Sequence, residues 1–216
     1  MQNTKPKIAI VDYGINNLFS IEKALSKVGC EAFITVDKNE ILNADGLVLP
    51  GVGAFNKAMK YLDDNDLTAT LKEYANSEKY ILGICLGMQL LMETSEEFGT
   101  HNGLGLIEGS CKKFDSANLK VPNINWIGIE DTKGFDLKSP LNSITSGEEM
   151  YFIHSYYVVP NDVKATIATS NYNGFEFCSA IQSNKVIGVQ FHPEKSSIKG
   201  IEILNNFKNL VLNDRK

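Results

Sequence analysis

The sequence predicts an α/β fold with a mostly parallel central sheet flanked by helices and an added antiparallel β portion in the second half of the chain. Up to about residue 92, short apolar runs alternate with segments of helical periodicity, which is the pattern of β-α-β units. From residue 109 to residue 189, strand-like segments follow one another, which favours antiparallel pairing. The sequence contains neither an internal repeat nor a low-complexity linker, so we expect a single domain over residues 1–216.

The first half opens with a strand and a helix. The apolar run at residues 8–11 predicts a buried strand, and residues 12–17 predict the turn after it. Apolar residues recur at helical spacing over residues 18–28, and Gly29 is a typical helix stop. The remaining elements of this half are expected as strands at 32–36 and 46–49, helices at about 55–62 and 67–75, and a strand at 80–82.

The second half is dominated by predicted strands. They are expected at residues 110–114, 150–153, 156–159, 165–169, 175–181 and 186–191. A helix over about residues 200–212 follows them and closes the chain.

Composition and charge argue against several classes of protein. The formal net charge is -5 and no long cluster of Lys and Arg is present, so we expect no nucleic-acid partner. The longest nearly apolar stretch, residues 80–92, is shorter than the roughly 20 residues that a membrane helix needs, and there is no signal-peptide core. We therefore expect a cytoplasmic protein that does not associate with a membrane.

The four cysteines are scattered along the chain without a C-x-x-C pair or a cluster of histidines. This spacing indicates neither a disulfide framework nor a metal site, and we expect reduced thiols and no metal or cofactor.

One cysteine has an unusual setting. In the stretch ILGICLGMQLL, Cys85 lies between Gly83 and Gly87, after an apolar strand and before a segment that can be helical. This is the pattern of a nucleophile elbow, in which the glycines permit a strained turn and the following helix points its positive end at the nucleophile. The alternative is that the glycines only allow a strand and a helix to pack closely around an inert thiol.

A nucleophilic thiol needs a base, and the candidates are His101, His154 and His192. His192 follows the last predicted strand and precedes Pro193, which favours extended geometry. Residues two apart then share a face, so the carboxylate of Glu194 can hold one ring nitrogen and leave the other for the thiol. A histidine beside a glutamate is often only structural, and it is the combination with Cys85 that favours a Cys-His-Glu triad.

Attack of a thiol on a carbonyl also requires donors for the oxyanion. The amide N–H of Leu86, directly after the nucleophile, is the first candidate. The segment PGVG at residues 50–53, at the end of another predicted parallel strand, can supply a second. This segment is not a dinucleotide loop, because the third glycine of that pattern would fall at Asn56.

Four stretches together resemble a known family. PGVGAF at 50–55, GICLGMQLL at 83–91, YFIHSYY at 151–157 and VQFHPEKS at 189–196 are similar to the class I (triad) glutamine amidotransferases, and more narrowly to the glutaminase subunits of imidazole glycerol phosphate synthase. The similarity extends from VDYGINNL near the start of the chain to the last predicted helix. It implies the flavodoxin-like fold of that family.

The resemblance implies roles for individual residues. Cys85 would be the nucleophile, His192 the base and acid, and Glu194 its orienting partner. The oxyanion hole would be formed by Leu86 with Val52 or Gly53. The residues that would hold the substrate glutamine are Gly51, Gln89, His154, Ser155 and Tyr156.

The resemblance also implies a partner. Ammonia from glutamine would pass to a (β/α)8-barrel cyclase, which makes imidazole glycerol phosphate and an aminoimidazole carboxamide nucleotide (AICAR) in histidine biosynthesis. In this family the oxyanion hole is often completed only when the partner holds its own substrate. The positions that match the partner contact and ammonia passage are Asn16, Trp126, Tyr151 and Lys195.

One strip of sequence departs from the family pattern. Where the family usually has Pro-His-x-Gly-Trp-Asn, this chain has PNINWI at 122–127, so Asn123, Asn125 and Ile127 differ. The departure leaves open a paralogous glutaminase that feeds a synthase of amino or amidino sugars for cell-surface polysaccharide. A catalytically silent subunit that regulates its partner and a thiol hydrolase that does not use glutamine are further alternatives, which the intact triad disfavours.

Overall fold

The computed structural model describes residues 5–14, 16–132 and 138–214. Its first half contains β1 (Lys7–Val11), α1 (Leu18–Lys27), β2 (Glu31–Thr35), α2 (Lys38–Asn43), β3 (Gly46–Leu49), α3 (Phe55–Asp64), α4 (Leu67–Asn76), β4 (Tyr80–Ile84) and α5 (Leu86–Leu90). The second half contains β5 (Met92–Ser95), β6 (His101–Asn102), β7 (Ile107–Lys113), β8 (Asn123–Asp131), β9 (Glu148–His154), β10 (Tyr156–Pro160), η1 (Val163–Ala165), β11 (Thr166–Tyr172), β12 (Phe175–Ser183), β13 (Val186–Val189), η2 (Pro193–Lys195) and α6 (Ser197–Asp214).

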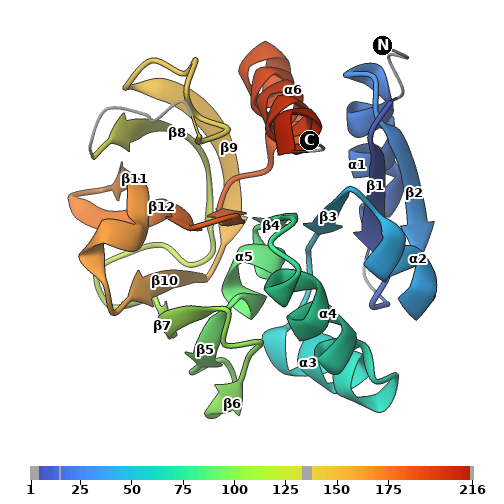
Figure 1. The fold of residues 1–216 in the computed structure, drawn as a ribbon. Helices are drawn as coiled ribbons and strands as arrows, with labels where there is room; N and C mark the ends of the chain where they lie inside the picture. Colours follow the sequence, from blue (N-terminus) through green and yellow to red (C-terminus); the bar gives the residue numbers. More distant parts are fainter. Residues whose placement is uncertain (1–4, 15, 133–137, 215–216) are drawn as a thin grey trace.

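The strands form one continuous sheet with a parallel part and a mostly antiparallel part (Figure 1). The parallel part has the order β2-β1-β3-β4-β13. β13 pairs antiparallel with β12 on its other side, and the sheet continues through β10, β7, β5 and β6. β8 pairs antiparallel with β9 and with β11, and β11 pairs with β12.

Helices cover the parallel part of the sheet on both faces (Figure 1). Because successive side chains of a strand point to opposite faces, Ile8 and Ile10 of β1 pack into one apolar cluster and Ala9 and Val11 into another. The first cluster contains the buried apolar side chains of α1 and α6, and the second contains those of α3 and α4. This burial on both faces explains why the parallel strands are nearly continuous apolar runs.

Two glycines lie opposite each other where α5 crosses the sheet. Gly83 of β4 is the register partner of Gly188 of β13. A Cβ on Gly83 would lie 2.7 Å from the carbonyl of Gly87, and a Cβ on Gly188 would lie 2.6 Å from the Met88 side chain. The missing side chains therefore leave the space in which α5 packs directly on the backbone of the two strands.

The predicted fold class is confirmed, with corrections to individual elements. The strand at 186–191, expected in the antiparallel portion, ends at Val189 and pairs parallel with β4 as well as antiparallel with β12. The apolar residues of this strand do not indicate whether it pairs parallel or antiparallel with its neighbours. α2, β5, β6 and β8 were not predicted, and α6 begins at Ser197 rather than at residue 200. β8 was missed because buried and exposed residues do not alternate regularly along it, so its sequence lacks the period of two that is typical of a strand.

Within the described part of the chain, no helix combines the length and the apolar character that crossing a membrane requires.

Candidate functional site

Cys85 occupies a strained turn between β4 and α5. Its backbone has φ 54° and ψ −106°, a conformation that is rare for residues other than glycine. Its amide donates to the Val189 carbonyl at 2.7 Å, which ties the turn to β13. A Cβ on Gly87 would lie 1.8 Å from the Leu49 carbonyl oxygen, so only glycine allows α5 to lie this close to β3. α5 itself is 5 residues long.

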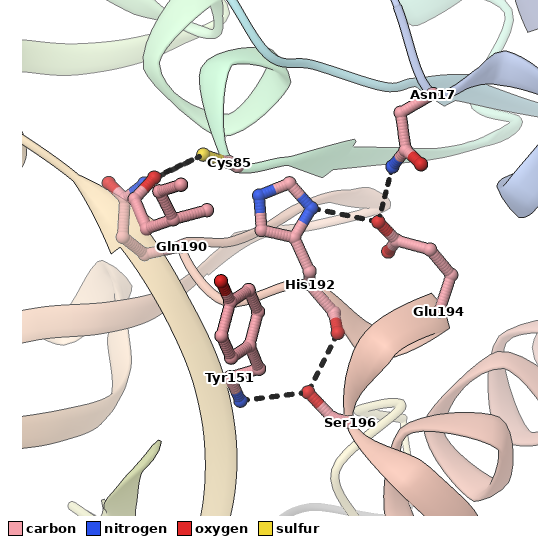
Figure 2. Close-up of polar contacts among 8 residues, drawn as sticks. Asn17, Cys85, Tyr151, Gln190, His192, Glu194 and Ser196 are labelled. Carbon is pink, nitrogen blue, oxygen red and sulfur yellow. Dashed lines mark hydrogen bonds and ion pairs between the residues drawn. The ribbon is translucent and has the colours of Figure 1, made fainter. Parts of the chain in front are cut away.

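His192 and Glu194 form a buried pair next to Cys85. The His192 ring lies between Cys85 and Glu194 (Figure 2), and its Nδ1 is 2.8 Å from Glu194 Oε1. Both side chains have 0% exposure. Asn17, at the turn before α1, donates from Nδ2 to the same carboxylate oxygen at 2.6 Å. His192 Nε2 makes no hydrogen bond with any residue that the structure describes, which leaves this nitrogen free to exchange a proton with the thiol.

The environment of His192 favours its protonated form. Burial alone would lower the pKa of the imidazole. Negative charge at Cys85 and the hydrogen-bonded Glu194 carboxylate outweigh that effect and raise the pKa of His192 to about 10. The arrangement therefore lets His192 hold a proton beside the Cys85 sulfur, which it can give to a leaving group there.

A cavity of about 240 Å³ opens on Cys85. Its lining contains Val52, Gly53, Cys85, Leu86, Gln89, Glu97, Pro122, Ile153, His154, Ser155 and Tyr156. The fold thus brings together the residues predicted for the oxyanion hole with most of those predicted for the substrate. His192 lies behind Cys85 rather than in the lining, because its side chain is fully buried.

The donor expected for the oxyanion is engaged in this structure. The Leu86 amide N–H donates to the Gly51 carbonyl at 3.4 Å. Gly51 therefore contacts the turn through its backbone and is not in the cavity lining. Gly53, two residues further along, has φ +139°, a backbone conformation that glycine adopts readily. Because Gly53 has no Cβ, the backbone at this end of the segment that carries the Gly51 carbonyl is not restricted by a side chain.

Two buried glutamines connect the cavity wall to the thiol. Gln89 Nε2 donates to the Tyr156 carbonyl at 3.0 Å and to Gln190 Oε1 at 3.2 Å. Gln190 Nε2 in turn donates to Cys85 Sγ at 3.5 Å (Figure 2). The thiol donates to the Ile153 carbonyl at 3.6 Å. These contacts hold the sulfur at the base of the cavity.

The residues predicted at the partner contact lie near this site. The Trp126 ring is 5.8 Å from the Tyr151 ring, which is 6.5 Å from the His192 ring. Trp126 is 48% exposed on β8, and Lys195 of η2 and Asn16 are also exposed. Aromatic and basic side chains therefore reach the surface close to the triad.

Sequence reasoning missed several residues of the site. Asn17 and Gln190 contact the triad, and Glu97 lines the cavity while its carboxylate accepts from the Phe55 amide at 2.6 Å. Ser196 Oγ donates to the His192 carbonyl at 2.7 Å and accepts from the Tyr151 amide at 3.0 Å (Figure 2). Of these, only Asn17 had a usable signal, because it follows β1 at the edge of the sheet where Cys85 lies.

Within residues 5–14, 16–132 and 138–214, no group of three His, Cys, Asp or Glu side chains is placed to hold a metal ion.

Comparison with known proteins agrees with this geometry. Residues 9–210 match the family Glutamine amidotransferase class-I. The chain is 45% identical over 204 residues to the imidazole glycerol phosphate synthase subunit HisH of Moorella thermoacetica, covering 94% of this chain and 95% of that protein. The subunit of the same name from Sulfurimonas denitrificans is 44% identical over 205 residues, which are 93% of this chain and 96% of that protein.

Among solved structures, a putative GMP synthase protein from Thermoplasma acidophilum has a TM-score of 0.73 at 20% identity, with 99% of this chain and 98% of that chain covered. At this identity the likeness concerns the fold alone. The extended matches to curated relatives go further: the chain belongs to the class-I glutamine amidotransferase family and, within it, to the HisH subunits of imidazole glycerol phosphate synthase.

Proposed function

We propose that this chain, as a single glutaminase domain over residues 1–216, hydrolyses glutamine and delivers the ammonia to a barrel synthase subunit in histidine biosynthesis. The observation that carries the proposal is the cavity that ends at Cys85, with His192 and Glu194 aligned behind the sulfur. Family membership supports the same reaction.

The chemistry proceeds in two halves. The Cys85 thiolate attacks the side-chain carbonyl carbon of glutamine, and the carbon–nitrogen bond then breaks as His192 gives its proton to the leaving ammonia. A glutamyl thioester remains on the sulfur. Water attacks the thioester while His192 accepts its proton, and glutamate leaves with the thiolate restored. Glu194, held by Asn17, keeps the imidazole ring oriented and stabilises its charge in both halves.

The oxyanion hole of this reaction requires a rearrangement. The Leu86 amide is to stabilise the oxyanion, together with an amide of Val52 or Gly53. For this to happen, the Gly51 carbonyl has to leave the Leu86 amide, which it contacts at 3.4 Å. We expect the bound partner and its ligand to favour that rearrangement, so glutamine hydrolysis would depend on demand for ammonia.

The partner surface is proposed around Trp126, Tyr151, Lys195 and Asn16. Trp126 and Tyr151 are in contact with each other, and aromatic side chains of this kind are typical anchors of protein interfaces. Ammonia released at Cys85 would be protonated and diluted in bulk water, which is the reason for a direct passage to the partner.

The proposal is tested by glutamate release from glutamine. The chain is mixed with the barrel subunit of a histidine-pathway synthase, with and without that subunit's nucleotide substrate. We expect strong stimulation by the nucleotide. Cys85→Ala is expected to abolish glutamate release while partner binding is retained, and Cys30→Ala, at another buried thiol, is the matched control with release preserved.

Two outcomes would contradict parts of the proposal. If the wild-type chain with its partner releases no glutamate, the glutaminase assignment is wrong. If glutamate release is flat and the chain fails to bind the histidine-pathway barrel, the ammonia acceptor lies in another synthase, for which the departures at Asn123, Asn125 and Ile127 make the sugar pathways the first candidates.

A further inference from the structure

A buried asparagine contacts a histidine of the cavity wall. Asn123, the first residue of β8, has 0% exposure, and its Nδ2 lies 3.0 Å from His154 Nε2. The other ring nitrogen of His154, Nδ1, lies 2.8 Å from the Tyr156 carbonyl oxygen. A carbonyl oxygen only accepts, so Nδ1 must carry the proton, and Nε2 must then accept from the Asn123 amide.

A second asparagine fixes the orientation of the first. Asn125 Nδ2 donates to Asn123 Oδ1 at 2.9 Å. The Asn123 amide therefore cannot rotate to present its oxygen to His154 without losing this bond. The Asn123 carboxamide thus supplies both an acceptor for Asn125 and a donor for His154. Asn125 itself is exposed, on the same face of β8 as Asn123.

His154 in turn contacts residues of the proposed glutamine site. The Tyr156 carbonyl accepts from His154 Nδ1 and also from Gln89 Nε2 at 3.0 Å. His154, Tyr156 and Gln89 all line the cavity at Cys85. The orientation of the His154 ring therefore determines how this part of the cavity wall is held.

The surroundings of His154 keep it neutral. The ring is packed against Phe114, Phe152 and Phe177, at centroid distances of 5.1, 5.7 and 5.2 Å. Burial lowers its pKa to about 4, because the bond to the Tyr156 carbonyl only partly opposes the effect and the charge of His192 adds to it. A neutral histidine has one donor and one acceptor nitrogen, which is the state that the contacts with Asn123 and Tyr156 require.

We propose that Asn123, oriented by Asn125, is a positioning residue for the glutamine substrate that acts by fixing the tautomer and orientation of His154 and, through it, the Tyr156 and Gln89 wall of the cavity. The inference rests on the proposed function, since it takes glutamine as the ligand of that cavity. It assigns a role to two of the positions at which this chain departs from the family pattern.

The tautomer is measured first, by long-range proton–nitrogen NMR of the chain labelled in its imidazole nitrogens. The sequence contains 3 histidines, so the signals are few, and His154→Gln assigns the one of interest. We expect His154 to carry its proton on Nδ1 and not to titrate above about pH 5.5. A proton on Nε2 would overturn the proposal, because Asn123 could then not be the donor.

Glutamine affinity is measured next, by calorimetry in a Cys85→Ala background bound to the barrel subunit, where no hydrolysis occurs. Asn123→Leu, which removes both amide bonds at similar side-chain size, is expected to weaken glutamine binding about tenfold, and Asn125→Ala about threefold. Because Asn125 acts through Asn123, adding Asn125→Ala to Asn123→Leu should cause no further loss. Thr70→Val, at a buried hydroxyl of α4 outside the cavity, is the control and should leave affinity unchanged.

In the chain with Cys85 intact, Asn123→Leu should raise the KM for glutamine about tenfold with kcat within about threefold of wild type, since the triad is not touched. If Asn123→Leu does not fold, Asn125→Ala alone still tests the proposal. Unchanged glutamine affinity in the folded variants, or additive losses in the double variant, would overturn the inference and leave the glutaminase assignment standing. Failure of the Cys85→Ala complex itself to bind glutamine would overturn both.

Discussion

Replacement of Glu194 by glutamine removes the charge of the triad carboxylate while keeping its shape. Glu194 Oε1 accepts from His192 Nδ1 at 2.8 Å and from Asn17 Nδ2 at 2.6 Å, and the amide oxygen of glutamine can accept both bonds. A hydrogen bond to a charged group contributes about 1.5–3 kcal/mol and a neutral one about 0.5–1.5 kcal/mol. The difference, about 1–2 kcal/mol, corresponds to a loss of about 5- to 30-fold in kcat/KM for glutamine hydrolysis.

The assay is glutamate release by the variant with its barrel subunit at saturating nucleotide, followed as a function of pH. The carboxylate stabilises the imidazolium, so its removal lowers the pKa of His192 from about 10, and the alkaline limit of activity should move to lower pH. Glu202→Gln, at a carboxylate of α6 paired with Lys199 at 3.2 Å, is the matched control and should behave as wild type. An unchanged rate and pH limit in Glu194→Gln would refute the assigned role of the carboxylate.

Three further predictions concern stability. His154 is neutral when folded, with a pKa of about 4 against 6.5 for the free side chain, so only the unfolded chain binds a proton in this interval. The free energy of unfolding should therefore rise by about 3 kcal/mol from pH 4 to 6.5, and urea denaturation of His154→Gln should lack this component; parallel curves would contradict it. Gly87→Ala places a Cβ 1.8 Å from the Leu49 carbonyl and should cost about 3 kcal/mol or more in thermal unfolding, so a wild-type melting temperature would refute the close approach. Tyr13→Phe removes the hydroxyl that donates to the buried Pro50 carbonyl and should lower the free energy of unfolding by about 1–3 kcal/mol in denaturant titrations, whereas an unchanged midpoint would argue against this bond.

Much of the fold was predictable because its signals are local. The apolar runs of the parallel strands and the helical spacing of α1 predict their elements to within a few residues. The two glycines around Cys85 likewise predict the tight turn that the structure contains. β8 was not predictable in this way, since its residues are partly polar on both faces and its pairing with β9 decides its conformation.

The candidate site was predictable to the extent that its chemistry lies in short motifs. Cys85 and the pair His192 and Glu194 each have a local pattern, so their approach in space could be expected. The contact between Asn17 and Glu194 joins residues 177 positions apart, so the place of Asn17 after β1 could suggest that it lies near the site but not that it contacts Glu194. Gln190 has the same difficulty, because nothing in its place between β13 and His192 indicates that its amide reaches the Cys85 sulfur.

The facing glycines Gly83 and Gly188 solve a problem of strand alignment. β4 and β13 are apolar on both faces, so a slip by one residue would expose no polar side chain to the core and would cost little by hydrophobic pattern alone. Packing against α5 makes such a slip unfavourable. After a slip, the side chain of Ile187 or Val189 would lie in the space beside α5 that the glycines leave empty. The relative placement of Cys85 and His192, which follow these two strands, therefore depends on the absence of two side chains.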